Sequence, residues 1–364
     1  MKQAHNSTRE SGVSTRESGV GPDTPLVQVD RLDVTFSART GLLRFEQARA
    51  LRRVSLEVFR GETVAVVGES GSGKTTLGRA SIGQLKPSSG RVLFDGTDLA
   101  TLGGQRRKAF RRRAQAIYQD PFASIDPYMT LAETLAEPLE IHGVGNRTER
   151  RERIEQALAE VRLTPVTEMA NAWPHMISGG QRQRLGIARA LMLQPEYLFA
   201  DEPVSMVDAS SRAEILHLLG ELQDRHGISI LYVTHDIATA RHSARRIVVM
   251  YLGEIVEEGP AADVVASPQH PYTKALIASV PEPDPANRHA HRPVLPGEPP
   301  SPMHVPAGCA FHPRCPEAIP GVCNRQSVAL EATGPQRRVA CHLYAADGSA
   351  EFPPKRDPRP DILA

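Results

Sequence analysis

The chain has 364 residues, of which 43 are basic and 42 acidic, so its formal net charge is +1. This balance gives no indication of a nucleic-acid or other polyanionic partner. No stretch approaches the roughly 20 apolar residues of a membrane-spanning helix, and the N-terminus lacks the apolar core of a secretory signal. We therefore expect a soluble, cytosolic chain with enough apolar material for one large domain or two ordinary ones.

The first hundred residues contain a repeat and then a series of strand patterns. Residues 7–13 and 14–20 both read STRESGV without an apolar period, so residues 1–24 are predicted to be a disordered extension. The segments LVQVDRLDVTF, VSLEVF, TVAVV and VLFDG then predict β-strands. The basic segment QRRKAFRRR predicts a solvated helix face rather than a nucleic-acid patch, because the chain as a whole is nearly neutral.

The pattern becomes helical at about residue 120 and returns to strands near residue 197. Ile154, Leu158 and Val161 share one helix face and predict a helical insert between two α/β portions. YLFAD and ISILYVTHD are short apolar runs typical of strands buried in a parallel sheet, and RIVVMYLGEIVEEG predicts a closing hairpin. A rise in Pro, Gly and His from residue 281 predicts a linker, and residues 346–364 are predicted to be a flexible tail.

A phosphate-binding loop is predicted between TVAVV and the helix that follows it. The segment GESGSGKT at residues 68–75 matches the pattern G-x-x-x-x-G-K-[ST], whose backbone N–H groups face a polyphosphate. We expect Lys74 to reach the β- and γ-phosphates and Thr75 to ligate Mg²⁺. The residues predicted to bind nucleotide here are Gly68, Glu69, Ser70, Gly71, Ser72, Gly73, Lys74, Thr75 and Thr76.

Two acidic residues follow the apolar strand in YLFADEP. An acid at such a strand end can bind Mg²⁺ through water, and the next acid can activate the attacking water. Two acids at a strand end are, on their own, more typical of an ordinary turn. The position of Asp201 and Glu202 behind the phosphate loop and the SGGQ segment favours a role in nucleotide chemistry over an ordinary turn.

GESGSGKT, the SGGQ of residues 178–181 and YLFADEP, in this order, resemble the ATP-binding cassette (ABC) ATPases. The resemblance implies an α/β fold: a P-loop NTPase cassette with a RecA-like core, an antiparallel β subdomain and a helical subdomain, plus a small irregular C-terminal extension. It places the ATPase domain at residues 25–265, with the helical subdomain at about 120–180.

The resemblance also implies roles for residues outside the phosphate loop. Gln119 in YQDP matches the family's Q-loop glutamine, which would sense Mg²⁺ and the γ-phosphate, and His235 in VTHD matches the switch histidine. The signature segment would close on ATP held by an opposite subunit, and Asp208 ends a loop, SMVD, that departs from the usual SALD. The implied catalytic residues are Glu202, His235 and Gln119; the implied Mg²⁺ residues are Thr75, Gln119 and Asp201; the implied residues of the composite site are Ser178, Gly179, Gly180, Gln181 and Asp208.

The family stacks the adenine base on an aromatic residue shortly before the first core strand. Phe36 in DVTF is the best match, and Phe45 is a second candidate, with an insert-like segment ARTGLLRFEQAR between them. A phenylalanine buried in the core is the structural alternative for Phe36.

Four longer strings resemble the ATPase subunits of dipeptide/oligopeptide ABC importers: QDPFASIDPYMTLAETLAEPL, WPHMISGGQRQRLGIARAL, HPYTKALIASVPEPDP and LPGEPPSPMHVPAGCAFHPRCPEA. The match runs from about residue 26 to 344, and the last two strings belong to the branch's C-terminal extension, here residues 266–345. DEPVS favours the second of the two ATPases of such importers.

The four cysteines lie in this extension, at Cys309, Cys315, Cys323 and Cys341. Their spacing, C-x5-C-x7-C-x17-C, differs from the C-x2-C pairs typical of structural zinc, and four thiolates can also hold an iron–sulfur cluster. Members of the resembled branch carry a [4Fe–4S] cluster at the matching cysteines, so the resemblance implies one here. Zinc and unmetallated thiols are the alternatives.

Together these features predict the ATP-hydrolysing, energy-coupling subunit of a membrane importer, with ATP and Mg²⁺ as ligands. The implied partners are two transmembrane permease subunits, a second ABC ATPase subunit expected to be a different chain, and, indirectly, an extracytoplasmic solute-binding protein. The chain would then lie on the cytoplasmic face of the cell membrane, bound through the permease. Dipeptides or oligopeptides are the expected solutes, with nickel or sugars as alternatives. A soluble ABC ATPase acting on nucleic acid, ribosomes or protein complexes, a redox-regulated ATPase and an exporter subunit are the rival functions.

Overall fold

The computed structural model describes residues 24–39, 45–120, 125–280 and 297–345. The predictions for residues 1–23, for the first part of the linker at residues 281–296 and for residues 346–364 lie outside these ranges.

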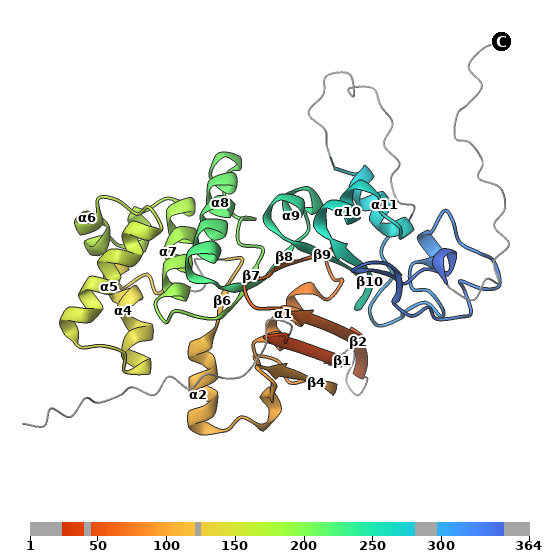
Figure 1. Ribbon diagram of the computed structural model, residues 1–364, viewed down its shortest axis with the longest axis horizontal. Helices are drawn as coiled ribbons and strands as arrows, with labels where there is room; N and C mark the ends of the chain where they lie inside the picture. The colour runs from red at the N-terminus through yellow and green to blue at the C-terminus, as the bar shows by residue number, and fades with distance from the viewer. Residues whose placement is uncertain (1–23, 40–44, 121–124, 281–296, 346–364) are drawn as a thin grey trace, which may run out of the picture.

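An eight-stranded sheet forms the centre of the molecule, in the order β11-β12-β10-β9-β3-β8-β7-β6 (Figure 1). The five strands from β9 to β6 are parallel, as the short apolar runs predicted, and β10 pairs antiparallel with β9 as the predicted closing hairpin. The strands are β3 (Thr63–Val67), β6 (Ala114–Ile117), β7 (Tyr197–Asp201), β8 (Ser229–Thr234), β9 (Arg246–Tyr251), β10 (Glu254–Pro260), β11 (Glu331–Gly334) and β12 (Arg337–Val339).

Two strands of the C-terminal extension belong to this central sheet. β12 pairs with β10 and β11 pairs with β12. The rest of the described extension is largely irregular, as predicted, but the extension shares backbone hydrogen bonds with the ATPase core.

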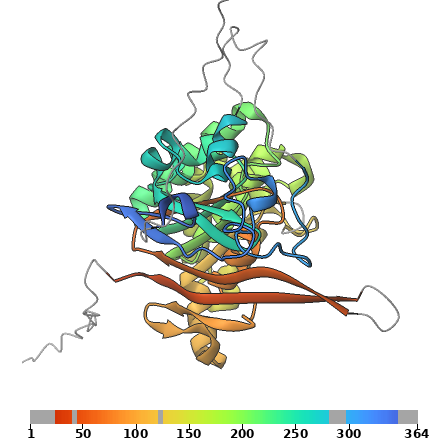
Figure 2. The ribbon, with the colours of Figure 1, turned by 90° about the vertical axis from the view of Figure 1, so that its right-hand side faces the viewer.

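A second, four-stranded antiparallel sheet has the order β2-β1-β4-β5. Its strands are β1 (Val27–Arg39), β2 (Phe45–Val58), β4 (Ser89–Phe94) and β5 (Thr97–Asp98). Figure 2 shows β1 and β2 as a long two-stranded ribbon beside the main body. The expectation of an insert between Phe36 and Phe45 was therefore wrong in part: residues 38–39 and 45–49 continue the two strands, since they pair across the hairpin from Arg39↔Phe45 onward.

The helices α4, α5 and α6 gather at one end of the molecule, with α7 beside them (Figure 1). Ile154, Leu158 and Val161 are buried there, as the helical pattern predicted. The helices are α1 (Lys74–Ser81), α2 (Gly104–Arg113), α4 (Leu131–His142), α5 (Arg147–Glu160), α6 (Val166–Asn171), α7 (Gly179–Leu191), α8 (Ala209–His226), α9 (Ile237–Ser243), α10 (Ala261–Ala266) and α11 (Pro271–Ala278), with 3₁₀ turns η1 (Leu99–Thr101), η2 (Pro174–Met176), η4 (His312–Arg314) and η5 (His342–Tyr344).

Strand β3 separates two hydrophobic cores. Ala65 and Val67 face the core that includes the helices α4 to α8, whereas Val64 and Val66 face the core shared with the antiparallel sheet. Successive side chains of a strand point to opposite faces, so a strand buried on both faces needs apolar residues throughout. TVAVV supplies them, and it fixes the loop that follows between the two cores.

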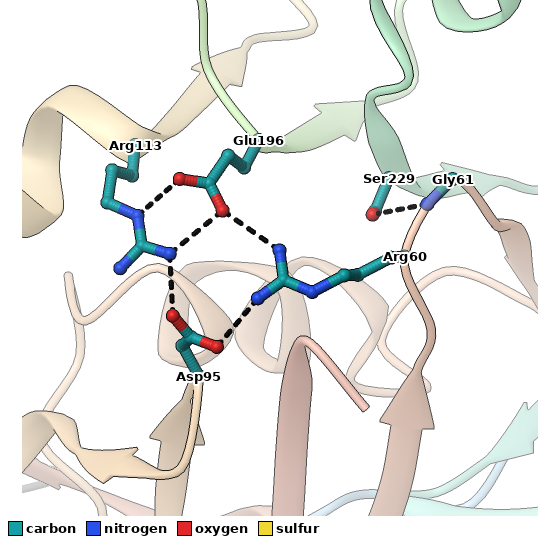
Figure 3. Close-up of polar contacts among 6 residues, drawn as sticks. All are labelled: Arg60, Gly61, Asp95, Arg113, Glu196 and Ser229. Atoms are coloured by element: carbon teal, nitrogen blue, oxygen red, sulfur yellow. Dashed lines mark hydrogen bonds and ion pairs between the residues drawn. The ribbon is translucent and has the colours of Figure 1, made fainter. Parts of the chain in front are cut away.

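A ring of four charged residues joins the antiparallel sheet to the main sheet (Figure 3). Arg60 contacts Asp95 at 2.6 Å and Glu196 at 3.0 Å, and Arg113 contacts the same two carboxylates at 2.7 and 2.5 Å. Burial would raise the pKa of Asp95, but hydrogen bonds and charge from the two arginines lower it. The hydrogen bond from Arg113 also lowers the pKa of Glu196.

We predict that Glu196→Gln lowers the free energy of unfolding by about 1 kcal/mol at pH 7, because the four side chains are partly exposed and their pairs are screened. Carboxylates with lowered pKa values stabilise the folded state above their unfolded pKa, and that stability is lost as the pH falls. The difference between the two proteins, measured by urea unfolding, should therefore shrink towards about pH 3. An equal loss in the exposed-residue control Glu152→Gln, or a difference independent of pH, would contradict the role of the ring.

Candidate functional site

The phosphate loop runs from the end of β3 to the start of α1, as the sequence predicted. Gly68 has φ 156° and Gly73 has φ 102°. A Cβ added at Gly68 would lie 2.3 Å from the carbonyl oxygen of Met250, and one at Gly73 would lie 2.5 Å from that of Ala50. The loop therefore passes too close to the backbones of β9 and β2 for any side chain at these two positions.

Lys74 and Thr75 open α1 and connect the loop to the acidic end of β7. The Lys74 ammonium donates to the carbonyls of Gly68 at 2.8 Å and Glu69 at 2.9 Å. The Thr75 hydroxyl donates to Asp201 Oδ1 at 2.9 Å. Burial lowers the pKa of Lys74, an effect that the nearby carboxylates of Glu202 and Asp201 oppose, while burial raises the pKa of Asp201.

These groups fit a magnesium–nucleotide ligand. A hydroxyl and a carboxylate from separate elements already meet at Thr75 and Asp201, and hard oxygen ligands of this kind suit Mg²⁺. The Ser72 hydroxyl is buried within the loop and has no hydrogen-bond partner among the described protein atoms. A phosphate oxygen would supply one.

The structure brings Gln119, Glu202 and His235 together. Glu202 follows β7 with φ 44°, and its backbone N–H donates to Val233 at 2.9 Å. Gln119 Nε2 donates to Glu202 Oε2 at 3.3 Å, and His235 Nδ1 lies 3.2 Å from Glu202 Oε1. The three residues predicted to be catalytic thus form one contact group, in which Glu202 is the shared member.

The signature residues begin α7, whose buried apolar side chains belong to one hydrophobic core, whereas those of α1 belong to the other. Ser178 caps α7: its Oγ accepts from Gln181 N at 3.2 Å, and Gln181 Oε1 accepts from Ser178 N at 2.9 Å. Helix α7 packs against β6, α4, α5 and α8, whereas α1 packs against β7 and β8 (Figure 1). The signature and the phosphate loop are therefore held by separate parts of the fold.

Asp208 lies beside the signature. It caps α8, and hydrogen bonds from Ser210 and Ser211 lower the pKa of Asp208 to about 2. A Cβ added at Gly180 would lie 3.3 Å from Ser211 Oγ. The contact between Gly180 and the start of α8 was not predicted, because no local pattern links two segments so far apart in sequence.

Phe36 is 44% exposed on β1, so the alternative of a buried core phenylalanine is wrong. The side chain of Phe45 lies outside the described residues. An exposed ring on the antiparallel sheet is available for stacking.

No pattern in the sequence indicated a link between the phosphate loop and the C-terminal extension. Arg314 makes a two-pronged ion pair with Glu69, with Nη1–Oε2 at 2.8 Å and Nη2–Oε1 at 3.2 Å. The hydroxyl of Tyr272 on α11 accepts from the backbone N–H of Glu69 at 2.8 Å. Arg314 and Glu69 are 245 positions apart.

The four cysteines are free thiols gathered in the extension. Burial raises the pKa of Cys315 to about 11 and that of Cys341 to about 12, and the neighbouring thiols add to both shifts. Cys309 N donates to Cys323 O at 2.8 Å. Within the described ranges, no group of three or more His, Cys, Asp or Glu residues could hold a metal ion, so the geometry gives the predicted [4Fe–4S] cluster no support.

A phosphate loop, an acidic strand end with its glutamine and histidine, and a separately held signature helix define an ATP-binding cassette ATPase. The ABC transporter family model matches residues 51–205, and the oligopeptide/dipeptide transporter C-terminal region matches residues 256–323. The chain belongs to the ATP-binding subunits of oligopeptide/dipeptide-type ABC transporters.

The sequence similarity to relatives covers nearly the whole cassette and extension. A putative peptide import ATP-binding protein of Brucella ovis is 45% identical, with 88% of this chain and 98% of that protein covered. The oligopeptide transport ATP-binding protein AppF of Bacillus subtilis is 43% identical, with 85% and 94% covered.

Solved structures agree on the fold. An ATP-binding cassette dimer in a post-hydrolysis state with ADP and Pi is 32% identical, with a TM-score of 0.57 and 65% of this chain and 98% of that one covered. CbiO1 from Clostridium perfringens, part of the transporter complex CbiONQ, is 28% identical, with a TM-score of 0.59 and 67% and 91% covered. Among the helices of the described segments, none combines the length and the apolar character needed to cross a bilayer.

We predict that Gly68→Ala weakens binding of a fluorescent ATP analogue by about 10-fold or more, because its Cβ must displace the loop from Met250. Gly61→Ala is the matched control: Gly61 also has a positive φ, but a Cβ there meets nothing within 4 Å. The control should cost about 1 kcal/mol of stability and leave nucleotide affinity unchanged. Equal affinities for the two variants would contradict the packing argument.

Proposed function

We propose that this ATPase is the energy-coupling subunit of a membrane importer for dipeptides or oligopeptides. The proposal is carried by the direct contact between the nucleotide loop and the extension typical of oligopeptide/dipeptide transporters, together with relatives named for peptide import. Import of nickel or a sugar through the same machinery is the alternative, since the cassette itself does not contact the solute.

In this proposal residues 68–76 hold the phosphates of ATP. Lys74 offers its ammonium to the β- and γ-phosphates, and the buried Ser72 hydroxyl gains a partner there. Thr75 and Asp201, already in contact, would hold Mg²⁺, with Gln119 completing the set. When bound, the metal neutralises charge that develops on the phosphoryl oxygens.

Glu202 is proposed as the general base, with Gln119 and His235 as its partners. Both carboxylate oxygens of Glu202 are engaged in the structure, one by each partner. Each carboxylate oxygen can accept a second hydrogen bond, so Glu202 would accept one from the attacking water while Gln119 and His235 hold the carboxylate in place.

The signature and Asp208 are proposed to act on ATP held by a second cassette. Ser178 caps helix α7, and the positive end of a helix dipole at such an N-terminus attracts an anion. The signature residues lie on another side of the sheet from Lys74, so completing the site requires a partner ATPase, expected to be a different chain. The exposed ring of Phe36 would stack on adenine.

Two permease subunits are proposed to dock where α4 meets the core. A cavity of about 370 Å³ there is lined by residues including Gln84, Tyr118, Glu137 and Ile141. Ile141, which lines this cavity, is 58% exposed, and an exposed apolar side chain at a cavity suits a partner. This docking would place the chain on the cytoplasmic face of the membrane, and the permease would receive solute from an extracytoplasmic binding protein on the opposite face.

The four cysteines are proposed to hold a [4Fe–4S] cluster that clips together a proline-rich extension. The support for this cluster is the resemblance to the importer branch, together with the location of all four free thiols in one short extension. Such a cluster would have a structural role, stabilising an irregular segment that has little core of its own.

We predict that Glu202→Gln slows ATP hydrolysis by about 10²- to 10⁴-fold, because the variant loses the base. The variant should still bind ATP and should trap the closed assembly. Capture of the tagged variant from native membranes with ATP should recover two permease chains and a second cassette, identified by mass spectrometry.

The matched control is Glu168→Gln, at an exposed position on α6, which should keep normal turnover. Adding Ile141→Asp to the trapped variant should remove the permeases and leave ATP binding intact. Recovery of soluble partners alone, or of none, would refute the importer proposal.

Protein purified without oxygen should show the broad visible absorbance of a [4Fe–4S] cluster and about four iron and four sulfide per chain. Cys315→Ser and Cys341→Ser should lose both and lower the melting temperature. Bound zinc, or metal-free thiols with unchanged stability in the variants, would refute the cluster.

A further inference from the structure

The C-terminal extension contacts the phosphate loop through a partly buried ion pair between Arg314 and Glu69. The Arg314 side chain is 6% exposed and that of Glu69 is 27% exposed, and both guanidinium prongs meet the carboxylate. A paired fork fixes distance and orientation together and is much less screened than a surface pair. A displacement of the Glu69 side chain therefore requires Arg314 to move with it or the ion pair to break.

Glu69 is also bound through its backbone. Its N–H donates to the Tyr272 hydroxyl at 2.8 Å, and its carbonyl accepts from the Lys74 ammonium at 2.9 Å. Arg314 and Tyr272, both beyond residue 270, thus bind the carboxylate and the N–H of Glu69, and the Glu69 carbonyl positions Lys74. A shift of Glu69 moves the acceptor that orients Lys74.

Arg314 is itself rigidly held. It ends the turn η4, in which His312 N donates to Cys309 O at 3.0 Å and Arg314 N donates to Phe311 O at 2.9 Å. The Phe311 ring is 1% exposed and packs against the rings of Tyr251 and Tyr272, with centroids 5.2 and 5.4 Å away. These hydrogen bonds and the packing of Phe311 therefore hold the turn, and Arg314 with it, in one position.

We propose that Arg314 is a positioning residue of the nucleotide site: through Glu69 it presets the phosphate loop and the Lys74 ammonium, so that the extension sets the affinity for ATP. This inference rests on the proposed role of residues 68–76 in phosphate binding. A simpler role for Arg314 is to fasten the extension to the core.

A second ion pair, which is buried, allows an experiment to distinguish the positioning role from the fastening role. Arg337 on β12 meets Glu257 on β10 at 2.7 Å, with side chains 12% and 0% exposed. This pair also joins the extension to the core, through the pairing of β12 with β10, and neither residue is bonded to Glu69. Breaking the Arg337–Glu257 pair removes one link between the extension and the core and leaves the ion pair of Glu69 in place.

The experiment measures binding of a fluorescent ATP analogue, and melting temperature, in the full-length chain. Arg314→Gln and Glu69→Gln should each weaken binding by about 10-fold, and the double variant should be no worse than either single one. Arg314→Lys should recover part of the affinity, because the lysine ammonium keeps the positive charge but cannot form the two parallel hydrogen bonds of a guanidinium. In the reconstituted transporter, KM for ATP should rise and kcat should change little.

Arg337→Gln should lower the melting temperature and leave affinity within about twofold of wild type. The inference is overturned if Arg314→Gln and Glu69→Gln both bind with wild-type affinity, or if Arg337→Gln weakens binding equally. If Arg314→Gln does not fold, Glu69→Gln decides. Lys74→Ala tests the underlying assignment separately: if it binds as well as wild type, the loop is not the phosphate site, whatever Arg314 does.

Discussion

The close approach of the phosphate loop to two neighbouring backbones is the constraint on which the site depends. Gly68 lies against Met250 of β9 and Gly73 against Ala50 of β2, so the loop is held between the parallel sheet and the antiparallel sheet. Strand β3, buried on both faces, brings the chain to this position. The nucleotide site therefore lies where the two layers meet, and the packing of each layer determines its geometry.

The same placement separates the signature from the phosphate loop within one chain. The group around Glu202 and the loop around Lys74 share the carboxyl ends of β3, β7 and β8, whereas the signature at Ser178 is carried by α7 among the helices of the insert. In the proposed function a partner cassette would complete the site. The extension adds a third support, since Arg314 holds Glu69 from outside the cassette.

The sequence predicted the parts of the fold that have local periodicity or a fixed motif. GESGSGKT after a buried strand, the apolar face at Ile154 and the closing hairpin were all correct, because each depends on residues within one or two elements. The contact of Gln119 and His235 with Glu202 was anticipated only through the resemblance. The outer part of the β1–β2 hairpin was missed because residues 37–39 (SAR) and 45–49 (FEQAR) lack a regular apolar alternation. The Arg314–Glu69 pair and the joining of β12 to β10 depend on tertiary packing across many residues, and no local pattern encodes them.

The most direct test of this account is a photo-cross-link from the loop beside the signature. Met206 is 59% exposed and adjoins Gly179, so a photoreactive amino acid at this position samples whatever faces the signature. In a Glu202→Gln background in native membranes, the account predicts a cross-link to a second cassette subunit that requires ATP and Mg²⁺. A cross-link only within the same chain, to residues 68–76, or one that is independent of ATP, would contradict a composite site completed by a partner.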